Sequence, residues 1–182
     1  MKYNDIIDEL SDSEAKIILR KLANEDEKTA KTISALAEKL IERVDLSQIS
    51  DSVFRDLDNL DVDVLWNNSG KTRYGYVDPG DEAYDMIERV LDEYIAEYDK
   101  YIRLNKRRIA MEYMIGIIKG IKKFDNEGIS EFRDWAEDVG YCFVRDYIEK
   151  FKNNEGNAEF IDEFLQRLDE SETEEQEIFE NL

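Results

Sequence analysis

The sequence predicts an all-α fold, and three observations support this prediction. A single proline, Pro79, interrupts the 182 residues. The long stretches between turns are rich in alanine, leucine, isoleucine, glutamate, lysine and arginine, which have high helix propensity. Along these stretches apolar residues recur at steps of three and four, the spacing that places them on one helix face. We therefore expect about seven helices joined in antiparallel hairpins.

The composition indicates one folded domain. Apolar residues make up 42% of the chain and aromatic residues 11%, which supplies a sizeable core and argues against disorder. We expect this domain to span residues 1–168. Residues 169–182 contain seven acids and no bases, and we expect them to form an acidic C-terminal tail.

The first helices are marked by a capping box and an apolar stripe. Ser11 and Glu14 have the spacing of a capping box, which opens a helix carrying Ile17, Ile18 and Leu22. In the next helix, residues 31–44, the apolar side chains again follow helical spacing. They are Ile33, Leu36, Ala37, Leu40, Ile41 and Val44.

A long helix follows the only proline. Asp78 is a suitable N-cap, and Pro79 stands where the first residue of a helix tolerates proline, so we expect about six turns ending near Ile102. A later helical segment contains Gly140, which we expect to divide it in two. The remaining helical segments are expected over residues 105–124, 132–151 and 158–168.

Two arrangements of these helices remain open, a closed bundle and a short α–α superhelix like those of HEAT or TPR proteins. An internal echo, LSDS at residues 10–13 and ISDS at residues 49–52, favours a repeat. No third copy exists in the sequence, and two independent helix caps would produce the same similarity. A regular repeat is therefore the minor alternative.

The stretch WNNSGKTRYGYVDPG, residues 66–80, contains a GKT triplet at residues 70–72 like the end of a phosphate-binding loop. Such a loop needs a glycine where this chain has Leu65, and it follows a strand, whereas the residues ahead of it here read as helical. We therefore interpret the stretch as a connection between helices, in which Gly75 and Gly80 supply turn geometry.

Two roles for this connection are weighed. In the favoured one, Trp66, Tyr74 and Tyr76 pack on neighbouring helices and pin the connection. In the alternative the connection is a contact surface, because it combines aromatic groups with positive charge in an acidic chain. Its candidate partner contacts are Lys71, Arg73, Tyr74 and Tyr76.

One helix reverses the overall charge. Between residues 103 and 123 there are seven bases and one acid, a local charge of +6. The favoured explanation is compensation by acidic neighbouring helices, and the alternative is a docking site for an anionic partner. The candidate partner contacts on this helix are Arg108, Lys119, Lys122 and Lys123.

The residue types exclude several chemistries. The chain has no histidine, so catalytic triads and mixed zinc sites that need imidazole are excluded. Cys142 has apolar neighbours and is expected to be a buried or half-buried structural thiol. The acidic run DLDNLDVD, residues 56–63, lacks the glycine and glutamate of a calcium-binding loop. We expect no catalytic residue, no cofactor and no metal site.

The net charge of −20 makes binding to nucleic acid or to an anionic membrane unfavourable, so a protein partner is expected. No apolar run approaches the roughly 20 residues of a membrane span, and the acidic start MKYNDIIDEL differs from a signal peptide. Together with a single cysteine, these features predict a cytoplasmic protein. The sequence leaves its oligomeric state open.

The string SGKTRYGYVDP, followed by a long helix and then AMEYMIGIIKGIKKF, resembles a prokaryotic α-helical family associated with SWIM zinc-finger proteins. The resemblance covers roughly residues 52–150. The finger itself is absent, because one cysteine and no histidine cannot form its ligand set. The resemblance implies a helical accessory module and transfers no catalytic residue.

The leading functional hypothesis is a non-catalytic α-helical interaction or scaffold module. One alternative is a nucleic-acid mimic, in which ordered carboxylates imitate phosphates and occupy a DNA-binding protein. The other alternative is an enzyme with a carboxylate site that the sequence does not mark.

Overall fold

A computed structural model describes residues 3–73, 75–135 and 139–169. Its regular elements are helices apart from one two-stranded hairpin, so the all-α prediction is confirmed for the part of the chain described. The structure divides the chain into two compact units, residues 1–43 and 44–182, where the sequence suggested one domain over residues 1–168. The expected acidic tail, beyond its first residue, lies outside the described residues.

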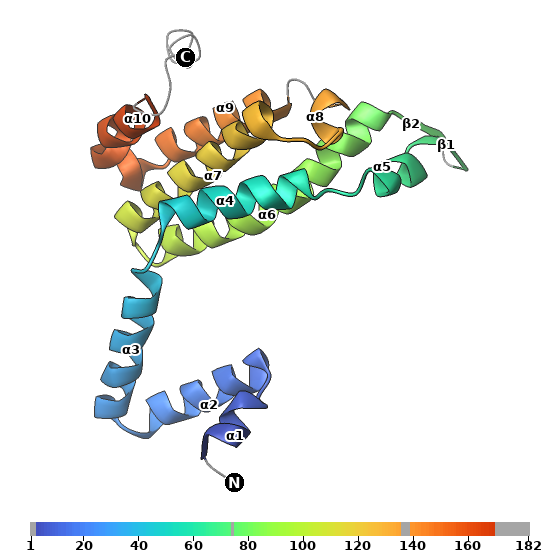
Figure 1. Cartoon of the computed structure of the whole chain (residues 1–182). Helices are drawn as coiled ribbons and strands as arrows, with labels where there is room; N and C mark the ends of the chain where they lie inside the picture. The colour runs from blue at the N-terminus through green and yellow to red at the C-terminus, as the bar shows by residue number, and fades with distance from the viewer. Residues whose placement is uncertain (1–2, 74, 136–138, 170–182) are drawn as a thin grey trace. The chain divides into compact units, whose positions relative to one another are not determined.

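The first unit contains three helices: α1 (Tyr3–Asp8), α2 (Asp12–Glu25) and α3 (Glu27–Ile41). The predicted capping box is present, since the Ser11 amide donates to Glu14 Oε2 at 3.0 Å and the Glu14 amide donates to Ser11 Oγ at 3.4 Å. Asp26 ends α2 and caps α3, where its carboxylate accepts from the Thr29 amide at 2.9 Å. The two longer helices therefore meet at a sharp corner (Figure 1).

The second unit contains the remaining elements. Its first part comprises α4 (Leu46–Asp58), α5 (Val62–Asn68), β1 (Gly70–Thr72) and β2 (Gly75–Val77). Its second part comprises α6 (Pro79–Arg103), α7 (Arg107–Glu127), α8 (Phe132–Trp135), α9 (Val139–Lys152), the 3₁₀ helix η1 (Glu155–Phe160) and α10 (Ile161–Asp169).

Helix α7 is the centre of the second unit. It packs against α4, α6, α9 and α10, and Figure 1 shows α4, α6 and α9 arranged along it. A solenoid brings together mainly successive repeats, whereas α4 and α7 are separated by α5, the hairpin and α6. The second unit is therefore a bundle. The buried side chains of α7 include Met111, Met114, Ile115, Ile117, Ile118, Ile121 and Phe124.

Two glycines allow α4 to approach α7 closely. A Cβ added to Gly120 would lie 2.5 Å from Val53 Cβ and 2.8 Å from the carbonyl oxygen of Ser50. A Cβ added to Gly116 would lie 2.9 Å from Ile49 Cβ. Because the two glycines are four residues apart, they share one face of α7, and small residues at this spacing let helix backbones come together.

Stacked aromatic rings join α9 to its neighbours. The rings of Phe151 and Phe164 have centroids 4.0 Å apart and connect α9 to α10. The rings of Tyr84 and Phe143, with centroids 4.9 Å apart, connect α9 to α6. Such pairs contribute about 0.5–1.5 kcal/mol beyond the apolar area that they bury.

Several predicted boundaries differ from the structure. The run expected to be helical up to Trp66 breaks after Asp58, because Asn59 bonds back to the Arg55 carbonyl oxygen at 2.8 Å and Asp61 starts α5 as its N-cap. The last predicted helix, residues 158–168, is a 3₁₀ turn followed by α10. The predicted start at Asp78 and Pro79 is confirmed, since Asp78 accepts from the Gly80 amide at 2.8 Å.

The echo at residues 49–52 lies inside α4, whose N-cap is Asp45, so the two similar strings are not both helix caps. The segment expected over residues 132–151 contains two helices, α8 and α9, as predicted, but Gly140 is the second residue of α9 and does not lie between them. It is close to α7, where a Cβ on Gly140 would overlap the carboxylate of Asp125.

We expect Gly120→Ala to destabilise the protein. Alanine improves helix propensity by about 1 kcal/mol, but overpacking a buried contact costs about 1–3 kcal/mol, and here the new methyl group meets Val53 and a backbone oxygen. Urea unfolding followed by circular dichroism measures the difference. The control is Asn126→Ala at an exposed site of the same helix, which should change the free energy of unfolding by less than about 0.5 kcal/mol. A Gly120→Ala protein more stable than the parent would contradict this packing.

Candidate interaction surfaces

The N-terminal unit, residues 1–43, exposes most of its large apolar side chains. Eight of the fourteen exposed large apolar side chains in the described residues belong to it, although it makes up only 43 of 182 residues. No residue of α2 or α3 is buried. The eight are Ile6, Ile7, Ile17, Ile18, Leu19, Leu22, Leu36 and Leu40.

Helical spacing gathers these side chains into faces. Ile18 and Leu22 are four residues apart on α2, and Leu36 and Leu40 are four residues apart on α3. Leu40 is 69% exposed and Leu36 57% exposed. The sequence predicted that these side chains share one face of each helix, and the three helices of the unit do not bury that face.

A shallow, open groove runs along α3 and is lined by residues of this helix alone. Leu36 and Ala35 form its apolar part, and it contains one acid, Glu27, which pairs with Lys31 at 2.6 Å. Its other lining residues are Lys28, Thr32 and Lys39. Leu36, one of the two exposed leucines of α3, therefore lies beside the lysines that line this groove.

The connection singled out in the sequence forms the β1–β2 hairpin. Its register pairs Lys71 with Tyr76, and Thr72 with Gly75. Gly70 and Gly75 have φ angles of 85° and 140°, which glycine adopts without strain, so the predicted turn role of Gly75 is confirmed. The GKT triplet is itself a strand and does not precede a helix, as a phosphate-binding loop does.

In the favoured role, Trp66, Tyr74 and Tyr76 pin this connection, and the exposure of Trp66 and Tyr76 does not support it. Tyr76 is 71% exposed and Trp66 47% exposed, while Tyr74 lies outside the described residues. The buried residue of α5 is Leu65. Trp66 lies one residue further along the helix, about 100° around it, which turns the larger side chain outward.

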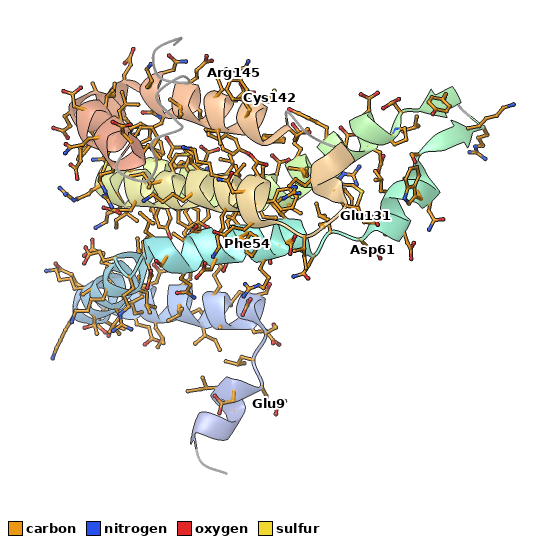
Figure 2. All side chains as sticks on the ribbon, turned by 45° about the horizontal axis from the view of Figure 1, so that its top comes forward. Glu9, Phe54, Asp61, Glu131, Cys142 and Arg145 are labelled. Atoms are coloured by element: carbon orange, nitrogen blue, oxygen red, sulfur yellow. The ribbon has the colours of Figure 1, made fainter. Side chains whose placement is uncertain are left out.

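Two basic side chains of α7 pair with acids of neighbouring helices in the second unit. Arg108 pairs with Glu163 of α10 at 2.9 Å, and Lys123 pairs with Asp51 of α4 at 2.8 Å. Lys123 also lies 4.9 Å from the ring centroid of Phe54, which Figure 2 labels on α4. These contacts support compensation by acidic neighbours over an anion-docking site.

The two sets of candidate contacts are not brought together. Lys71, Arg73 and Tyr76 are exposed on the hairpin. On α7, Lys119, Lys122 and Lys123 are half-buried, while Arg108 is exposed and pairs with Glu163. The strands lie at the end of the bundle where α6 begins, and α7 begins at the other end (Figure 1).

The acids of the DLDNLDVD run serve the fold. Asp58 accepts from the amides of Ile129 and Ser130 at 2.8 and 3.0 Å, which ties α4 to the segment after α7. Asp56 accepts from the Tyr94 hydroxyl at 2.5 Å. In the residues that the structure describes, no cluster of three or more potential ligands could hold a metal ion.

Two further groups have local chemical interest. Cys142 is half-buried on α9, as expected, and lies near Arg145, which pairs with Asp146 at 3.0 Å (Figure 2).

Burial raises the pKa of Asp125 to about 6, although Arg133 opposes this shift. Asp125 could not be singled out from the sequence, because its neighbour Gly140 is distant along the chain.

Comparisons of the chain with protein-family models, with curated proteins and with solved structures find no match. Among the described residues, none of the helices combines the length and the apolar character needed to span a membrane.

We expect Asp125→Asn to stabilise the protein above pH 6. The folded-state pKa of Asp125 is raised above the ordinary 3.8, so the folded state binds the proton more tightly, and stability falls as pH rises from about 4 to about 6. Asparagine removes this loss, on the order of 1–2 kcal/mol after allowing for partial solvation. Thermal unfolding of the parent and the variant at pH 4 and pH 7 measures the difference in their stability. A difference that is the same at both pH values would contradict a raised pKa of Asp125.

Proposed function

We propose that the protein is a non-catalytic α-helical interaction module, in which the N-terminal unit binds a protein partner. The observation that carries the proposal is the apolar face of α2 and α3, which the unit leaves exposed. The second unit is the scaffold, since its own helices bury α7 and pair two of its bases with acids. The resemblance to the helical region of SWIM zinc-finger proteins agrees with an accessory role of this kind.

The energetics favour covering the N-terminal unit. Burying apolar surface is worth about 25 cal/mol per Å², and helices of 14 and 15 residues are only marginally stable in water unless an apolar face is packed. Clusters of exposed apolar side chains on soluble proteins commonly mark contact sites. A protein partner supplies the matching apolar surface, and the single cysteine suits a cytoplasmic setting.

Photo-cross-linking in cells tests this proposal. A photoreactive phenylalanine analogue replaces Leu36 in the full chain, and mass spectrometry identifies what it captures. We expect a discrete protein adduct, because the partner covers this side chain. The matched control carries the same analogue at Ile129, which is 90% exposed on the second unit and has no exposed apolar cluster around it in sequence.

A third probe at Tyr76 examines the hairpin surface. Adducts at Leu36 that are missing at Ile129 and Tyr76 support binding through the N-terminal unit. Capture at Tyr76 without capture at Leu36 would move the contact surface to the hairpin and contradict the proposal. Equal capture at Leu36 and Ile129 would also contradict it, because it would reflect nonspecific contact.

A further inference from the structure

The charge of the chain is unevenly divided between the two units. Residues 1–43 contain eight bases and ten acids, a net charge of −2. Subtracting this from −20 leaves −18 for residues 44–182. Two copies of the second unit therefore repel each other strongly, whereas two copies of the N-terminal unit meet with almost no net repulsion.

The N-terminal unit lacks the devices that stabilise very small folded units. Units of about 40 residues usually depend on disulfides, a metal or oligomerisation. The chain has no histidine, and its one cysteine is Cys142 in the other unit, so neither a disulfide nor a cysteine–histidine metal site can form within residues 1–43. Of these three devices, oligomerisation is the one still open to the unit.

The size and charge pattern of the unit suit a second copy of itself. A stable interface takes about 20–30 residues from each partner, and α1, α2 and α3 contain 6, 14 and 15 residues. Residues 3–15 hold five acids and no bases. Along α3, in contrast, the groove is lined by three lysines and one acid: Lys28, Lys31 and Lys39, with Glu27 paired to Lys31.

This pattern is self-complementary. In a two-fold dimer, a contact between segment A of one copy and segment B of the other occurs twice, since each copy supplies both segments. If the acidic residues 3–15 of one copy lie against α3 of the other, both contacts join opposite charges. The exposed leucines of α3 and the isoleucines of α1 and α2 are then covered together.

We propose that the partner of the N-terminal unit is a second copy of this chain, bound two-fold through α1, α2 and α3. This inference rests on the proposed function and names its partner. The interface pairs the acidic residues 3–15 of each copy with the lysine-lined groove on α3 of the other. Its apolar centre includes Ile18, Leu22, Leu36 and Leu40.

Sedimentation velocity of the full chain over a wide concentration range tests the dimer. We expect a reversible dimer of twice the chain mass. Leu36→Gln with Leu40→Gln should raise its dissociation constant about a hundredfold or more, because two large apolar side chains leave the interface. Val64→Gln with Ile129→Gln, a pair of exposed apolar sites in the second unit, should leave it unchanged.

A charge exchange tests the pairing without removing apolar contacts. Lys28→Glu with Lys39→Glu, and separately Asp8→Lys with Glu9→Lys, should each weaken the dimer of that variant, because like charges then face each other. Mixing the two variants should restore a mixed dimer, since both two-fold contacts regain opposite charges. Circular dichroism of each variant checks that the helices of the second unit are intact.

The outcomes separate this inference from the proposed function. A parent chain that stays monomeric at every concentration overturns the dimer, and so does a dimer that the leucine variant leaves unchanged. Mixing that fails to restore association overturns the proposed pairing. If the Leu36 cross-link captures a different protein while the chain is monomeric, the proposed interaction function is supported and the dimer is rejected. If the chain is monomeric and the Leu36 cross-link captures nothing, the interaction function and the dimer are both rejected.

Discussion

The second unit depends on the close contact between α4 and α7. At Gly116 and Gly120 the surface of α7 consists of backbone, and Ile49 and Val53 of α4 fill the space that side chains would occupy. Packing of this kind gives many dispersion contacts and buries both helices without an intervening layer. With α4 on one side, α7 can be enclosed by α6, α9 and α10 on its others, which explains why most of its middle is buried.

The same contact organises the polar groups around the core. It places Asp51 of α4 beside Lys123 of α7, and it brings Asp58 to the amides of Ile129 and Ser130. Asp51 thereby pairs with a base of the central helix, and Asp58 holds the segment that follows that helix. The second unit thus buries the apolar side chains of its central helix within its own fold. The unsatisfied apolar surface is concentrated in residues 1–43.

Local signals in the sequence predicted the helices well, because caps and spacing act within a few residues. The capping box at Ser11 and the start at Asp78 are examples. The same spacing could not show what covers a helix: the stripe containing Leu36 and Leu40 looks like a core face but is exposed. Nor could it orient Trp66, since a neighbouring leucine, Leu65, fills the buried position of α5. The glycines of α7 carried a usable signal, because glycine in a helix interior costs about 1 kcal/mol unless packing requires it.

We expect residues 44–169 to form a bundle that is stable by itself, and the helices of the N-terminal unit to be stabilised by a second chain. Hydrogen exchange of the full chain, measured by mass spectrometry at low and high protein concentration, tests it most directly, because amide protection reports the stability of each segment. We expect peptides from α4 and α7 to exchange slowly at both concentrations, and peptides from α2 and α3 to become protected only at the higher one. Protection of α2 and α3 that equals that of α7 in dilute solution would contradict the claim.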